Sequence, residues 1–244
     1  MFAYAVATIK FLDSNVHLPQ KQLDAIVHLP EHTDHEGKTH LNSETTFDSF
    51  YTLIFEVAFG KHDPEIHSKV QSTIGAVVLL ENPLPLSGIA ELIGIDHEEI
   101  RLFLILVQLL LVFDGDFNQP VKPIHKSFAD FITNPSCCTN TRFHISPEYM
   151  HLELLTNCLR VMNNGLEQNL LSLPDYALNS EVKDLETRIN NHISSALQYA
   201  CQSWHNHLAK TEGDIEYIVS SLHIFLEKKF LAWLEVISAL GATT

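Results

Sequence analysis

The sequence has 244 residues, of which 45% are apolar and 18% are charged, which is typical of a chain that folds into one or two compact domains. Fifteen Lys and Arg residues stand against 30 Asp and Glu residues, so the formal net charge is −15. A chain this acidic repels the phosphates of nucleic acids and the surfaces of anionic membranes. We therefore expect neither nucleic acid nor a membrane as a partner.

The first part of the chain contains an apolar segment followed by a polar one. "FAYAVATIKFL", residues 2–12, has the apolar spacing of an amphipathic helix and no basic segment ahead of it, which predicts N-terminal helices within 1–30 and no signal peptide. Residues 31–46 are almost all polar and predict a linker. Four histidines in or beside this linker could bind a metal, but we favour a solvated loop and predict no metal site: His28, His32, His35 and His40.

The segment up to Thr133 has the element order of a winged helix. A helix at about 70–80, a short helix opened by Ser87 and a third helix from His97 precede "LLLVFDGDFNQPVKPI", residues 109–124. This last stretch places an Asp-Gly-Asp turn between two short extended segments, which predicts a small β-hairpin whose Pro123 lies at a sheet edge.

The most apolar run is Leu102–Phe113, "LFLILVQLLLVF". It has twelve residues and contains Gln108, whereas a helix that spans a bilayer needs about 20. The run therefore predicts a core helix and not a membrane span.

The four cysteines follow no paired spacing. Cys137 and Cys138 are adjacent, while Cys158 and Cys201 lie inside helical patterns. We expect reduced thiols in a cytoplasmic chain.

Capping signals and helical spacing continue to the end of the chain. Asp63 and Ser146 each precede Pro and Glu, and Asp96 and Thr211 each precede an acidic residue by three positions. Apolar residues then recur at helical spacing in three series, 155–170, 189–208 and 215–237, the last with a shift in phase between Phe225 and Phe230. The predicted fold is mainly α, with four parts: N-terminal helices at 1–30, a polar linker at 31–46, a winged-helix domain at 47–133 and a C-terminal helical domain at 134–244.

The third predicted helix is poorly suited to reading DNA. A helix that does so needs Arg, Lys, Asn and Gln side chains, yet this one opens with "DHEEIR" and offers only Arg101 against Glu98 and Glu99. Between Lys69 and Thr133 there are four Lys and Arg residues and eight Asp and Glu residues, a net charge of −4. We expect the winged helix to contact protein.

Few residues suggest chemistry, and we predict no enzyme. The Gly37-Lys38 pair lacks the upstream Gly and the Ser or Thr of a phosphate loop. Ser127 beside His125 does not by itself define a nucleophile and its base. Cys201, His205 and His207 lie on or near the apolar face of one predicted helix, which favours a core cysteine with a half-exposed histidine over a metal site.

His125 is the candidate site residue. It stands in "PIHKSFADFI", residues 123–132, between the predicted hairpin and the next helix. The pattern His-x-Ser-Phe-x-Asp-Phe resembles the histidine motif that closes the winged-helix domain of NACHT-type signalling NTPases. Four further stretches resemble the region that follows the NACHT module in fungal NLR-like proteins of the STAND class: "STIGAVVLLENPLPLSGIAELIGID", "HLELLTNCLRVMNNGLEQNLLSL", "SSALQYACQSWHNHL" and "FLEKKFLAWLEVISALGA". Residues 2–12 are similar to the helix that ends the NACHT module itself.

This resemblance implies a function. In that family the winged-helix histidine senses the bound nucleotide by touching the ADP phosphate, a role that falls on His125 here, with Phe128 and Phe131 packed behind it. The chain would then be a non-catalytic regulatory and interaction segment with a NACHT-type NTPase module and a downstream repeat domain as partners. ATP or ADP would bind only to that module, because the phosphate loop and the other sensor residues are missing from the chain.

Two other functions remain open at the level of the sequence. One is a free-standing winged-helix regulator that binds DNA. The other is a helical protein-interaction adaptor with no link to a nucleotide. Titration with duplex DNA separates the first from the NACHT hypothesis, and substitution of His125 separates the second.

Overall fold

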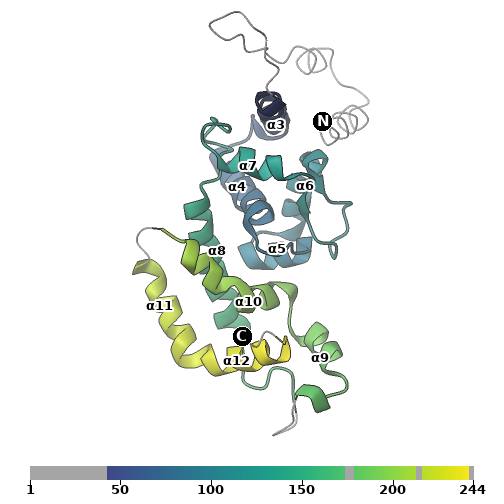
Figure 1. Cartoon of the computed structure of the whole chain (residues 1–244), viewed down its shortest axis with the longest axis vertical. Helices are drawn as coiled ribbons and strands as arrows, with labels where there is room; N and C mark the ends of the chain where they lie inside the picture. The colour runs from purple at the N-terminus through teal and green to yellow at the C-terminus, as the bar shows by residue number, and fades with distance from the viewer. Residues whose placement is uncertain (1–42, 174–178, 213–215, 242–244) are drawn as a thin grey trace, which may run out of the picture.

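The computed structural model describes residues 43–173, 179–212 and 216–241, and Figure 1 shows them as a mainly helical molecule. The helices predicted within 1–30 lie outside this part. Of the predicted linker at 31–46, only 43–46 are described, and they form the start of helix α3 (Ser43–Phe59). The linker prediction is wrong for these four residues, because Ser, Glu and Thr are common in the first turn of a helix as well as in linkers.

Three helices follow α3: α4 (Pro64–Leu79), α5 (Leu86–Ile93) and α6 (His97–Leu106). Asp63 starts α4 by accepting a hydrogen bond from the main-chain N–H of Ile66, and Asp96 starts α6 in the same way with Glu98 and Glu99. Gly94 ends α5 in the left-handed conformation, with φ 72°, which glycine adopts without the steric cost that other residues bear.

The predicted hairpin is present. Strand β1 (Leu111–Val112) pairs antiparallel with β2 (Lys122–Pro123), with Leu111 opposite Pro123. A bridge between Pro85 and Pro120 joins the segment before α5 to this pair. The chain thus has the element order of a winged helix. Helix α4 comes first, then the bridging segment at Pro85, helices α5 and α6, and the two strands.

The apolar run Leu102–Phe113 is not one core helix. Helix α6 ends at Leu106, a 3-10 turn follows at Gln108–Leu110, and the rest enters the hairpin. Leu102 and Leu106 are 56% and 48% exposed. The prediction failed because a run of leucines does not distinguish a helix from a strand, or an inner face from an outer one.

Helix α7 (Lys126–Thr133) packs against α3 in the upper part of the molecule, and the helices that follow it extend into the lower part (Figure 1). These later helices are α8 (Pro147–Gly165), α9 (Leu185–His192), α10 (Ser195–Lys210), α11 (Glu216–Ile224) and α12 (Phe230–Ala239), with a 3-10 turn at Asn179–Glu181. Helix α8 packs most extensively against α10 and also contacts α4 and α5, so it joins the winged helix to the C-terminal helices.

Two details of the apolar series differ from continuous helices. The series 189–208 is interrupted because Ser194 accepts a hydrogen bond from the N–H of Leu197 and starts α10 anew. The phase shift after Phe225 coincides with a π-helical segment, Phe225–Lys229, which adds residues to the turn and re-aligns the apolar side chains.

The core is continuous from α3 to α12. At its upper end Phe128 and Phe131 of α7 are almost fully buried and contact Tyr51, with Phe55 stacked on Phe128. Phe128 and Phe131 are thus packing residues, as expected. They fix α7, and with it His125, against α3.

Candidate functional site

His125 lies at the N-terminal end of α7 with its side chain exposed. Its Nδ1 atom accepts a hydrogen bond from the main-chain N–H of Ser127, at 3.1 Å, and so caps the helix. A main-chain N–H is always a donor, so Nδ1 must be the acceptor and the neutral ring carries its proton on Nε2. The exposed imidazole can therefore donate from Nε2 to a group outside this chain.

A short hydrogen-bonded chain connects His125 to α3. Ser127 Oγ lies 2.8 Å from His125 Nδ1 and 2.8 Å from the hydroxyl of Tyr51. Burial raises the pKa of Tyr51, so that its hydroxyl stays protonated and can donate to Ser127. The orientation of the imidazole thus depends on how α3 packs against α7.

This arrangement differs from a hydrolytic triad. In a triad one ring nitrogen faces the serine and the other faces a carboxylate. Here Nδ1 serves both the hydroxyl and the main-chain N–H of Ser127, and the third member is a phenol that donates. The geometry suits a positioned donor better than a base that activates a nucleophile.

The structure places the other candidates apart. Gly37, Lys38 and the four linker histidines lie outside the described residues. Cys201 is buried, His205 is exposed and His207 is fully buried, so the core cysteine is confirmed and the degree of burial of His207 was missed. The four cysteines are free thiols. Burial raises the pKa of Cys138 to about 11 and that of Cys201 to about 12, which leaves them in the thiol form.

A second polar cluster lies where α8 and α10 meet. His151 Nδ1 and His207 Nδ1 are 2.9 Å apart, and the hydroxyl of Tyr199 is 2.8 Å from His207 Nε2. The same hydroxyl accepts a hydrogen bond from the main-chain N–H of Glu81, which follows α4. We call His151, Tyr199 and His207 the histidine–tyrosine cluster. Its side chains connect three segments that are far apart in the sequence.

One spacing in the sequence could have revealed part of this cluster. Tyr199, Ser203 and His207 recur every fourth residue, so they share one face of α10, and all three are buried. His151 is 56 residues away in sequence from His207, and only the packing of α8 on α10 brings it there.

The cluster is electrically unusual because two imidazoles are buried together. Burial lowers the pKa of His207 to about 4 and also lowers that of His151. Burial raises the pKa of Tyr199, so the phenol keeps its proton. Both rings are accordingly neutral near pH 7.

The outer surface of α6 is acidic and apolar. Arg101, its one cationic side chain, lies with its Nε 2.7 Å from Glu98, and Lys69 of α4 lies 2.9 Å from Glu99. Leu102 points outward beside them. The positive charges here are already paired within the chain.

In the described part of the chain, no three His, Cys, Asp or Glu side chains are placed to hold a metal ion. The helices in this part are too short or too polar to cross a lipid bilayer. Comparison with protein families, with curated proteins and with solved structures finds no match to the chain.

Proposed function

We propose that this chain is a non-catalytic regulatory and interaction segment of a cytoplasmic, NACHT-type signalling NTPase. It transmits the nucleotide state of an attached NACHT module to downstream domains. The observation that carries this proposal is the outer face of α6, where Leu102 and Leu106 are exposed beside Glu98. Exposed leucines with paired charges suit packing against protein, whereas a DNA reader needs free cationic and amide side chains.

His125 is the residue we assign to nucleotide sensing. Its exposed position and its Nε2 proton suit a hydrogen bond to a phosphate oxygen. The sequence contains no GxxxxGK[ST] phosphate loop, so the attached module would hold the nucleotide. Because the imidazole is coupled through Ser127 and Tyr51 to α3, gain or loss of the phosphate contact would favour one of two arrangements of α7 and the module.

A second exposed surface supports a downstream partner. Large apolar side chains are exposed along α11, the π-helical segment and α12, with Leu231 as much as 76% exposed: Val219, Ile224, Leu226, Phe230, Leu231 and Leu234. Apolar side chains concentrated in this way mark interaction sites. We assign them to the downstream repeat domain.

The experiment that tests the sensing role compares His125→Asn with the unaltered protein that contains the attached module. Asn is a good N-cap residue, so this variant retains the start of α7 but loses the imidazole Nε2–H. We expect a fluorescent ADP analogue to leave the variant about tenfold faster. The matched control is His192→Asn, an exposed histidine on α9. Equal release rates in all three proteins would exclude nucleotide sensing by His125.

A further inference from the structure

The histidine–tyrosine cluster also joins the two main parts of the described chain. His151 comes from α8, Tyr199 and His207 come from α10, and the N–H of Glu81 belongs to the connection between α4 and α5. The Glu81 carboxylate is in turn paired with Lys210 at the end of α10. The turn after α4 is thus attached to α10 both inside the molecule, through Tyr199, and at the surface, through Lys210 and Asn206.

The hydrogen bonds of the cluster accommodate two neutral imidazoles. The Tyr199 hydroxyl accepts from the N–H of Glu81 and is free to donate its own proton to His207 Nε2. His207 then carries its proton on Nδ1 and donates to His151 Nδ1. Both imidazoles are neutral in this arrangement, and each contact has one donor and one acceptor.

An added proton places a positive charge on a ring that is buried between α8 and α10. Because the two imidazoles are in direct contact, a charge on one ring also opposes a charge on the other. We propose that the histidine–tyrosine cluster is a proton-sensitive latch, which holds the turn after α4 against α8 and α10 and releases it when the imidazole pair is protonated.

Charged groups around the cluster also affect the protonation of His151 and His207. Glu81 from the α4–α5 connection and Glu148 from α8 favour a protonated imidazole, while Lys210 and His205 from α10 oppose it. Cys158 on α8 helps to raise the pKa of Tyr199. For both imidazoles, burial lowers the pKa by more than any of the neighbouring charges changes it.

The direction of the pH effect follows from the His207 pKa, which is about 4 when folded against an ordinary 6.5. Between these values the unfolded or opened chain binds a proton that the closed chain excludes. The latch is therefore fully closed above about pH 6.5 and weakens as the pH falls toward about 4. It does not depend on the role proposed for His125.

Hydrogen exchange of the full chain tests the latch. We expect protection of the Glu81 amide, corrected for intrinsic rates, to fall at least about tenfold from pH 7.5 to 5.0. The side chain in His207→Gln cannot titrate. In this variant the fall in protection of the Glu81 amide from pH 7.5 to 5.0 should be no larger than the fall for the other buried amides. His205→Gln is the matched control, because His205 is an exposed histidine on the same helix, and it should keep the full pH effect. Equal pH effects in the two variants would overturn the proposal.

A measurement on the unaltered chain covers the case in which His207→Gln does not fold. NMR of ¹⁵N-labelled histidine at pH 5.5 should show the ring of His207 in its neutral form. A protonated His207 ring at this pH would also overturn the proposal.

Discussion

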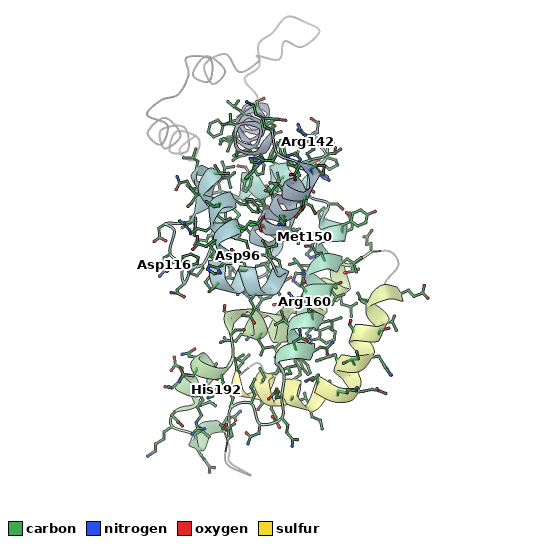
Figure 2. All side chains as sticks on the ribbon, turned by 180° about the vertical axis from the view of Figure 1, so that it is seen from behind. Asp96, Asp116, Arg142, Met150, Arg160 and His192 are labelled. Atoms are coloured by element: carbon green, nitrogen blue, oxygen red, sulfur yellow. The ribbon has the colours of Figure 1, made fainter. Side chains whose placement is uncertain are left out.

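Arg160 of α8 donates from Nη2 to the main-chain oxygen of Leu92, 2.6 Å away, at the C-terminal end of α5. It donates also to the oxygen of Glu91, at 3.0 Å. Carbonyl oxygens at the end of a helix lack partners within the helix and carry partial negative charge. Arg160, labelled on α8 in Figure 2, therefore joins the C-terminal helices to the winged helix.

Arg160→Ala should lower the free energy of unfolding by about 1–2 kcal/mol, since charged hydrogen bonds to α5 are lost. Urea denaturation measures this value. Arg101→Ala, which removes an exposed pair with Glu98, should cost less than about 1 kcal/mol. An equal loss in the two variants would show that Arg160 does not link the two parts.

Tyr199→Phe should destabilise the chain by about 2–3 kcal/mol. The substitution removes one hydroxyl and leaves both the N–H of Glu81 and the ring of His207 without their partner. Tyr149→Phe is the matched control, because Tyr149 is 79% exposed and should change the melting temperature little. A Tyr199→Phe variant as stable as the control would mean that water replaces the hydroxyl.

His125→Ala should cost about 1 kcal/mol, because the cap of α7 is lost. His125→Asn should recover most of this free energy. Chemical denaturation followed by circular dichroism distinguishes the variants. If His125→Asn lost as much unfolding free energy as His125→Ala, the imidazole itself, and not merely a hydrogen-bond acceptor at this position, would be what stabilises the start of α7.

The combined Leu102→Gln and Leu106→Gln variant should keep its unfolding free energy within about 0.5 kcal/mol, because these side chains are exposed. Its binding of a hydrophobic dye should decrease. Leu104→Gln on the same helix, where the side chain is fully buried, should cost at least about 3 kcal/mol. Strong destabilisation by the outer pair would contradict its assignment to an interaction surface.

Features set by local chemistry could be predicted from the sequence. The caps at Asp63 and Asp96, the hairpin beside Pro123 and the interruption after Phe225 each depend on neighbouring residues. The two caps and the hairpin, which lie between residues 63 and 123, also support the predicted winged-helix order.

The missed features depend on packing between distant segments. No local pattern shows that His151 meets His207, or that Tyr51 of α3 bonds to Ser127. The outward position of Leu102 was hidden inside an apolar run, since periodicity gives a face but not what covers it.

Sequencing the transcript upstream of the Met1 codon tests most directly the proposal that the chain is attached to a NACHT module. We predict an open reading frame that continues upstream and encodes a GxxxxGK[ST] phosphate loop. An in-frame stop codon between the start of the capped transcript and Met1 would contradict the claim.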